Sequence, residues 1–209
     1  MYIGRFAPSP TGELHFGSLL AALASYLDAN KNNGLWLLRI DDLDPPREQP
    51  GATEKIIDTL DQYGFHWDRD IVLQSQSHQH YQQALNQLIK ARACYPCQCS
   101  RKEIIERTGH TQYDQHCLFT PVTKEKNISY RFKSTGKTVQ WLDSIQGIQS
   151  SSEHPLNDFV LKRRDQLWAY QLAVAVDDHR MGVTHVVRGY DLLSESVNQL
   201  ALITALNLQ

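Results

Sequence analysis

The run LWLLRI at residues 35–40 most restricts the fold that this chain can adopt. It has the length of a strand and is apolar almost throughout. A strand with one face in water alternates apolar and polar residues, whereas a strand buried on both faces gives a nearly continuous apolar run. Strands buried on both faces belong to parallel sheets, whose crossover connections are usually helices. The run therefore predicts an α/β fold.

The flanking segments alternate in the way that such a sheet requires. Apolar residues at helical spacing predict helices over residues 18–30, 52–63, 78–93 and 194–206. Strand-like segments are predicted at residues 2–7, 71–73, 158–162 and 184–187. Alternating strands and helices indicate a parallel sheet with crossover helices.

Residues 94–157 do not continue the alternation of strands and helices. Short strand-like pieces at 129–133 and 138–142 surround a group of four cysteines, and SRKE at 100–103 predicts a capped helix. We therefore divide the chain into an α/β domain of residues 1–93 and 158–209 and an inserted α+β module of residues 94–157.

Charge and hydropathy limit the class of protein. The net charge is −2, which argues against a chain that binds nucleic acid over its whole surface. Residues 94–149 carry 8 basic and 5 acidic side chains, and the run KRR at 162–164 fits contact with RNA as well as a solvated face. No apolar run approaches the ~20 residues of a membrane helix, and the N-terminus lacks a secretory pattern. We expect a cytoplasmic monomer with no membrane contact.

The junction of the first strand and the first helix carries the sequence RFAPSPTGELHFGS at residues 5–18. The helix N-terminus offers unpaired N–H groups and a partial positive charge, which suit a phosphate. Gly12 and Gly17 allow the backbone to approach a ligand closely. His15 can donate a hydrogen bond to a phosphate oxygen as charge builds in a transition state. Neither the Walker pattern nor Gly-x-Gly-x-x-Gly is present.

This junction resembles the nucleotide-binding motif of class I aminoacyl-tRNA synthetases in its glutamate-specific form. RIDDLDPPR at 39–47, AY at 169–170, VDDH at 176–179 and VRGYD at 187–191 resemble further segments of that group, in the same order. HFGS, DPPR and the cysteine pattern are most similar to glutamyl-queuosine tRNA(Asp) synthetases, a shortened family of paralogues. The resemblance implies a Rossmann-like catalytic domain with an inserted zinc-knuckle module.

The resemblance also implies an activity. ATP, with Mg²⁺, would activate L-glutamate to glutamyl-adenylate, and the glutamyl group would pass to the queuosine base at the anticodon wobble position of tRNA(Asp). One alternative is the catalytic part of a glutamyl-tRNA synthetase, which charges the tRNA 3′ end. Another is a non-catalytic RNA-binding paralogue that keeps the fold.

The implied site residues fall into two groups. The catalytic group is His15, Gly17 and Ser18, and the glutamate-binding group is Arg5, Phe6, Ala7, Pro8, Ser9, Asp41, Tyr170 and Arg188. An arginine can hold a carboxylate bidentately, so Arg5 and Arg188 at predicted strand ends suit the carboxylates of glutamate. Asp41 would meet the ammonium group. It stands where the family commonly has glutamate, and a water or Asp42 would fill the gap.

The cysteines Cys94, Cys97, Cys99 and Cys117 lie within 24 residues, which favours a metal site over disulfides in a chain without a signal peptide. The resemblance implies one Zn²⁺ held by Cys97, Cys99, Tyr113 and Cys117. From the residues alone, His110, His116 or Cys94 would be a less unusual fourth ligand than a phenol. Four reduced cysteines without metal are the remaining alternative.

The family has a second, lysine-bearing loop that neutralises the phosphates, and this sequence shows none before Gln209. We interpret the chain as a fragment whose C-terminal part is truncated. Binding of nucleotide or glutamate is therefore expected to survive better than turnover. The missing loop is also what favours the non-catalytic alternative.

Overall fold

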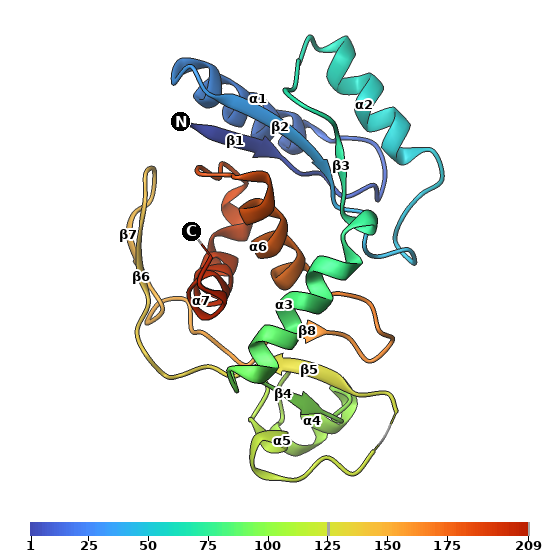
Figure 1. The fold of residues 1–209 in the computed structure, drawn as a ribbon, viewed down its shortest axis with the longest axis vertical. Coiled ribbons are helices and arrows are strands. Elements are labelled where there is room, and N and C mark those ends of the chain that lie inside the picture. Colours follow the sequence, from blue (N-terminus) through green and yellow to red (C-terminus); the bar gives the residue numbers. More distant parts are fainter. Residues whose placement is uncertain (125, 209) are drawn as a thin grey trace. The chain divides into compact units, whose positions relative to one another are not determined.

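The computed structural model describes residues 1–124 and 126–208, and the chain divides into two compact units (Figure 1). The first unit comprises Met1–His78 and Val176–Leu193, and the second comprises Gln79–Ala175 with the segment that starts at Ser194. These boundaries differ from residues 94 and 157, at which the sequence suggested an insertion. The inserted module therefore stays a prediction.

The first unit contains the predicted parallel sheet (Figure 1). Its strands pair side by side in the order β1 (Ile3–Phe6), β2 (Leu35–Ile40) and β3 (Val72–Leu73). Helix α1 (Phe16–Lys31) connects β1 to β2, and α2 (Ala52–Gln62) lies between β2 and β3 in the sequence. The prediction of a parallel sheet with crossover helices is confirmed for these three strands. The strand predicted at residues 158–162 does not join them, because Val160–Lys162 pairs antiparallel with Ser129–Phe132 in the second unit.

Strand β2 is buried on both faces, as its apolar run predicted. Successive side chains of a strand point to opposite faces. Trp36, Leu38 and Ile40 belong to one core cluster, in which the Trp36 ring lies 5.6 Å from that of Phe65. Arg39 points to the other face and has no exposed surface. The strand thus places a charge inside the protein.

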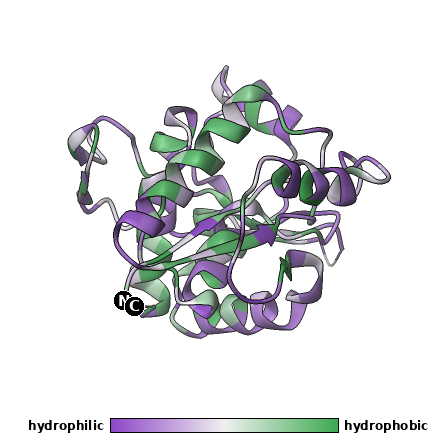
Figure 2. Ribbon diagram, turned by 90° about the horizontal axis from the view of Figure 1, so that it is seen from above, coloured by the Kyte–Doolittle hydropathy of each residue, from purple (hydrophilic) through white to green (hydrophobic). Residues whose placement is uncertain are grey.

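Helix α1 buries a different face from the one that its leucines suggest. Its buried residues are Ala22, Ser25 and Ala29, whereas Leu20 and Leu27 are 54% and 55% exposed. The indole of Trp36 packs against this face, where its N–H donates to the Ser25 hydroxyl at 2.9 Å and its ring lies 5.1 Å from that of Tyr26. Figure 2 shows hydrophobic and hydrophilic residues mixed along the helices of the molecule.

The strand predicted at residues 184–187 is wrong, because the structure has no regular element there. The segment does lie beside β1. The N–H groups of Thr184 and His185 both donate to the Ile3 carbonyl, at 2.9 and 3.2 Å. The Ile3 N–H donates to the Thr184 hydroxyl at 2.9 Å, so a side chain replaces the backbone acceptor that a ladder needs.

The second unit is built around an antiparallel sheet of order β4-β5-β8. Its strands and the separate hairpin are β4 (Cys94–Cys97), β5 (Ser129–Phe132), β8 (Val160–Lys162), β6 (Gln140–Asp143) and β7 (Gly147–Ser150). Its longer helices are α3 (His78–Lys90), α6 (Tyr170–Met181) and α7 (Ser196–Leu206), and its shorter helices are α4 (Arg101–Thr108) and α5 (His116–Phe119). Helix α3 starts at His78, the last residue of the first segment of the first unit. The part of α6 from Val176 onward also belongs to the first unit. The predicted capping box of α4 is present.

Two short 3₁₀ segments complete the described elements, at Gln74–Gln76 and Tyr190–Glu195. None of the helices that the structure describes has the length and apolar content needed to cross a membrane.

Two leucine-to-alanine changes test which helix faces are buried. Leu60 in α2 has no exposed surface, so Leu60→Ala is expected to lower the free energy of unfolding by about 2–5 kcal/mol. Leu27→Ala in α1, the matched control, is expected to change it by less than about 0.5 kcal/mol. Urea denaturation followed by circular dichroism measures both. A comparable loss for both variants would contradict the assignment of the α1 faces.

Candidate functional site

The loop after β1 leads into α1 through His15, which caps the helix. Its backbone is extended, and its Nδ1 accepts a hydrogen bond from the Ser18 N–H at 3.2 Å. Its Nε2 lies 3.2 Å from the Ser18 hydroxyl. With Nδ1 as an acceptor, the neutral ring carries its proton on Nε2. His15 is exposed, so this N–H can be redirected to an incoming phosphate oxygen.

Gly17 provides the space for this imidazole. A Cβ at residue 17 would lie 3.1 Å from both Cε1 and Nδ1 of His15. The three residues predicted as catalytic, His15, Gly17 and Ser18, are therefore coupled to one another in the first turn of α1. The predicted reason for Gly17 was close approach of a ligand, and the structure gives the neighbouring side chain as the nearest constraint.

Backbone hydrogen bonds connect the loop after β1 to the loop after β2. The Asp41 N–H donates to the Pro8 carbonyl at 2.9 Å, and the Gln49 N–H donates to the Pro10 carbonyl at 2.9 Å. Carboxyl ends of adjacent parallel strands are where open α/β sheets bind ligands. Two of the predicted site residues, Pro8 and Asp41, are thus brought together at that edge.

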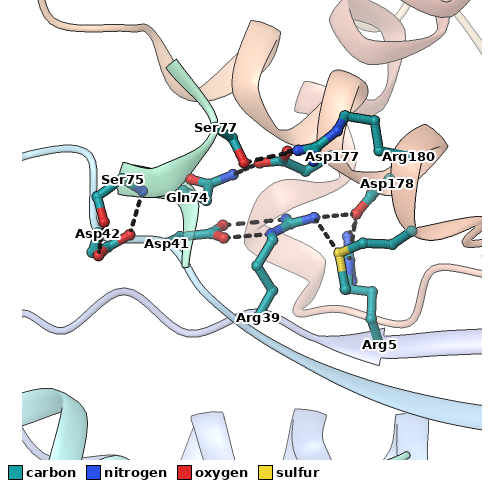
Figure 3. A network of polar contacts seen from close by, with 11 residues as sticks. Arg5, Arg39, Asp41, Asp42, Gln74, Ser75, Ser77, Asp177, Asp178 and Arg180 are labelled. Carbon is teal, nitrogen blue, oxygen red and sulfur yellow. Dashed lines mark hydrogen bonds and ion pairs between the residues drawn. The ribbon is translucent and has the colours of Figure 1, made fainter. Parts of the chain in front are cut away.

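A network of buried charges extends from these strands to α6 (Figure 3). Arg39 holds Asp41 through Nε–Oδ1 at 2.6 Å and Nη2–Oδ2 at 3.4 Å. The Arg39 Nη1 reaches Oδ1 of Asp178 at 2.5 Å. Asp178 in turn holds Arg5 through Nε and Nη2, each at 3.2 Å. The positive charges of Arg5 and Arg39 are therefore balanced by the negative charges of Asp41 and Asp178. The Nη1 of Arg5 takes no part in its two bonds to Asp178.

Burial sets the strength of these contacts. Burial would raise the pKa of the Asp178 carboxyl, but Arg5 and Arg39 outweigh it and hold that pKa below its usual range. At Asp41, burial is the larger influence and raises the pKa, although Arg39 opposes it. A cation arriving beside Asp41 would favour its ionised form.

Asp177 and Asp178 are the residues whose importance the sequence did not reveal. VDDH at 176–179 was named only as a segment that resembles the family, and both aspartates lie inside α6. Asp177 is buried, accepts from Gln74 Nε2 at 3.0 Å and pairs with Arg180 at 2.9 Å. The charge pattern in sequence gave no signal of these partners, because they come from distant segments.

Asp42, suggested to share with Asp41 the contact to the ammonium group, has another partner. Its carboxylate accepts from the Ser75 N–H and hydroxyl at 2.8 and 2.6 Å (Figure 3). Of the other predicted glutamate-binding residues, Phe6 is buried, Ala7 is half-buried and Ser9 is exposed. Arg188 is half-buried in the segment after α6 rather than at a strand end, and it keeps contacts of its own.

Tyr170, also predicted to bind glutamate, is the first residue of α6 and is 39% exposed. It belongs to the second unit, whereas Arg5 and Asp41 belong to the first. Its participation in one site with them stays a prediction.

The second unit contains a cluster of sulfur atoms. The Sγ atoms of Cys97, Cys99 and Cys117 all lie within 4.8 Å of one another, and all three residues are buried. Tyr113 completes the group, since its hydroxyl oxygen lies 3.3 Å from Cys97 Sγ and accepts from the Cys117 N–H at 2.8 Å. Within the described residues, neither Cys94 nor a histidine joins the three sulfurs.

The donor set fits a tetrahedral metal ion. Three thiols and one phenol converge, and the two cations Arg131 and Arg107 lie 3.3 and 3.7 Å from Cys97 and Cys99. Burial raises the pKa of Cys99 to about 11 and also raises the pKa of Tyr113. At Cys117, burial is outweighed by hydrogen bonds, first among them that with Tyr113, and the pKa is lowered. A metal ion would favour the deprotonated form of each ligand.

Comparison with known proteins shows the family to which the chain belongs. The family described as tRNA synthetases class I (E and Q), catalytic domain, matches residues 3–209. The chain belongs to this family. Its fold is therefore that of a class I synthetase catalytic domain, as the sequence motifs predicted.

Relatives within the class I family carry more specific names. The chain is 49% identical to "Glutamyl-Q tRNA(Asp) synthetase" of Klebsiella pneumoniae (strain 342) over 203 residues, which cover 96% of this chain and 68% of that protein. The protein of the same name from Escherichia coli (strain K12) is 48% identical, with 65% of its length covered.

A glutamate tRNA ligase of Elizabethkingia meningosepticum, solved in complex with its amino acid, superposes with a TM-score of 0.87 at 28% identity. The match covers 100% of this chain and 47% of that one. The chain thus spans about two thirds of its curated relatives and about half of this ligase.

Asp178→Asn tests the charge network of this synthetase-family domain. The change keeps the shape but leaves Arg5 and Arg39 with an unbalanced buried charge, so the free energy of unfolding is expected to fall by about 3 kcal/mol. Glu13→Gln, which breaks the exposed pair with Lys55, is the control and should cost less than about 1 kcal/mol.

The effect also depends on pH. The pKa of Asp178 is lower in the folded chain than in the unfolded one. The contribution of ionised Asp178 to the free energy of unfolding is therefore complete above the unfolded pKa near ~3.9. It is lost as the pH falls through the folded pKa. The difference in free energy of unfolding between wild type and Asp178→Asn, measured by urea denaturation, should become smaller below pH ~4. If the two proteins are equally stable at neutral pH, Asp178 does not belong to the network.

Proposed function

We propose that the protein activates L-glutamate with ATP and transfers the glutamyl group to the queuosine base of tRNA(Asp). The observation that carries the proposal is the edge of the sheet at β1 and β2. There a buried, carboxylate-held Arg5 precedes a loop that leads to a histidine-capped helix N-terminus. The names and identities of the relatives support the same activity, and they favour it over charging of a tRNA 3′ end because the glutamate tRNA ligase is only 28% identical.

The first step joins two anions. The carboxylate of glutamate attacks the α-phosphorus of ATP, and pyrophosphate leaves. Positioning and charge neutralisation dominate the catalysis of such a transfer. His15 would donate from Nε2 to a phosphate oxygen, while the N–H groups of the first turn of α1 face the same negative charge. Mg²⁺, when bound with ATP, neutralises further phosphate charge.

Recognition of glutamate would use fixed charges. Asp178 holds Arg5 in one orientation, so that Nη1 can donate to a substrate carboxylate, and Arg188 would act on glutamate with it. Asp41 would receive the ammonium group. Both of its oxygens accept from Arg39, but each carboxylate oxygen can accept more than one hydrogen bond. We propose Phe6, Ala7, Pro8, Ser9 and Tyr170 as the remaining lining of this site.

In the second step, the queuosine base attacks the activated carbonyl and AMP leaves. The proposed partners are therefore glutamate, ATP and tRNA(Asp) carrying queuosine. Such a reaction belongs to the cytoplasm, where tRNA and ATP are found.

Arg188→Ala is expected to abolish glutamate-dependent exchange of pyrophosphate into ATP while the circular dichroism spectrum is unchanged. The reason is the loss of a guanidinium that pairs with a substrate carboxylate. Lys31→Ala, at the far end of α1 from His15, removes an equal charge and should retain exchange. Full exchange by the arginine variant would remove Arg188 from the site.

The position of glutamate on the tRNA product distinguishes modification of queuosine from charging of the tRNA 3′ end. Glutamate on the anticodon base of queuosine-containing tRNA(Asp) supports the proposal, and an ester on the terminal adenosine contradicts it. A protein that binds RNA without any exchange activity would be the non-catalytic alternative.

We also propose that Cys97, Cys99, Tyr113 and Cys117 hold one Zn²⁺. The ion would crosslink β4, the loop after it and α5, a structural role for which a closed four-ligand shell suits zinc. Arg107 and Arg131 beside the sulfurs support this, since they offset the negative charge of bound thiolates.

Metal analysis tests the zinc site. Protein purified without chelator is expected to hold about one zinc per chain. Cys117→Ser should lose it, and Tyr113→Phe should bind it more weakly because one ligand is missing. Cys94→Ser is the matched control outside the cluster and should keep the metal. Zinc near zero in the unaltered protein would leave four reduced cysteines as the correct interpretation.

A further inference from the structure

A solvent-open cleft in the second unit is lined by four arginines. Its volume is about 420 Å³, and Arg101, Arg131, Arg163 and Arg164 border it. One acid, Asp165, lines the same cleft and pairs with Arg163 at 2.7 Å. The lining therefore has an excess of three positive charges. We call it the arginine cleft.

The four arginines converge from separate parts of the chain. Arg101 begins α4, Arg131 lies in β5, and Arg163 and Arg164 follow β8. A basic run in the sequence is often only a solvated surface, but the fold adds two distant arginines to this run. The shared cleft is thus a property of the folded structure and not of the run at 162–164 alone.

Several contacts hold the guanidinium groups in place. Arg131 lies 3.9 Å above the Tyr113 ring, and its Nη1 donates to the Asp158 carbonyl at 2.8 Å. Arg164 Nε donates to the Asn127 carbonyl at 2.9 Å. The carbonyl acceptors are neutral, so these two bonds orient the cations without cancelling their charge. Arg131 Nε also donates to Cys97 Sγ at 3.3 Å, and the Glu103 carboxylate lies near Arg164, so Arg101 and Arg163 complete the positive lining.

Like charges gathered around a concave surface repel one another unless an anion joins them. The planar guanidinium donates in a fork that matches phosphate oxygens. An open cleft with several such forks suits a chain of phosphates better than a single small anion. We propose that the arginine cleft binds the phosphodiester backbone of RNA.

This inference deepens the proposed function, on which it rests for the identity of the RNA as tRNA. It also links the sulfur cluster to RNA binding. Arg131 contacts both Cys97 and Tyr113, two of the proposed zinc ligands, so a bound metal would fix the position of one cleft arginine. Arg131 itself is a poor test residue, because its loss would disturb the cluster.

The test measures the affinity of the chain for a tRNA(Asp) transcript as a function of salt, with the double variant Arg163→Ala/Arg164→Ala. Each lost phosphate contact should weaken binding roughly tenfold near 0.1 M salt and reduce the slope of log K against log salt by about 0.9. The double variant should therefore bind about a hundredfold more weakly, with a slope smaller by about 2. An unrelated tRNA should lose as much, since backbone contacts carry no sequence information.

Two controls separate the cleft from general charge and from folding. Lys90→Ala/Lys137→Ala removes two exposed charges outside the cleft in the same unit and should change affinity much less. Arg163→Lys/Arg164→Lys keeps the charge and should retain most of the salt slope with a smaller loss of affinity. Unchanged tRNA affinity in the alanine variant, or an equal loss in the lysine control, overturns the proposal. Competition by inorganic phosphate alone, with tRNA affinity independent of the arginines, overturns the RNA assignment.

Pyrophosphate exchange measures glutamate activation and so tests the proposed function separately from RNA binding by the arginine cleft. Exchange retained in Arg163→Ala/Arg164→Ala with tRNA binding lost supports the cleft. Arginine-dependent binding of tRNA by a wild-type chain that shows no exchange would also support the cleft, while contradicting the proposed function.

Discussion

A guanidinium enclosed in the sheet of the first unit is the constraint on which its ligand-binding edge depends. Arg39 has no contact with water, and an ion in that environment is tolerated only with opposite charge and hydrogen bonds around it. Asp41 and Asp178 supply them. The end of β2 and the second half of α6 are therefore tied to one charged group, and Asp178 extends the tie to Arg5. The same contacts that satisfy a buried ion orient the cation proposed to recognise glutamate.

The elements of the first unit could be predicted because each follows from local pattern. The apolar run of β2 and the turn after β1 determine a parallel sheet without knowledge of distant partners. The segment at Thr184 could not be predicted, because its β-branched residues favour a strand while its hydroxyl takes the hydrogen bond that a strand would use. The exposed leucines of α1 are a similar case. Their spacing is helical, but the face of α1 that packs on the sheet is the one that carries Ser25, whose hydroxyl accepts from the Trp36 indole.

The candidate site was predictable where a motif is contiguous and unpredictable where it is assembled by the fold. His15, Gly17 and Ser18 adjoin in sequence and in space. Asp178 is separated from Arg5 by 173 positions, and nothing in either neighbourhood indicates the pairing. The sulfur cluster lies between these cases, since the cysteine spacing suggested a metal while the stacking of Arg131 on Tyr113 required the structure. The arginine cleft arises in the same way, from segments that the antiparallel sheet brings together.

The first turn of α1 also limits how this chain can vary. Alanine is the best helix former and glycine costs about 1 kcal/mol more in a helix, so residue 17 looks like an easy target for a more rigid protein. A methyl group there would press on the imidazole ring at 3.1 Å and displace it from Ser18. A more stable helix and an imidazole held beside Ser18 therefore make opposite demands on residue 17.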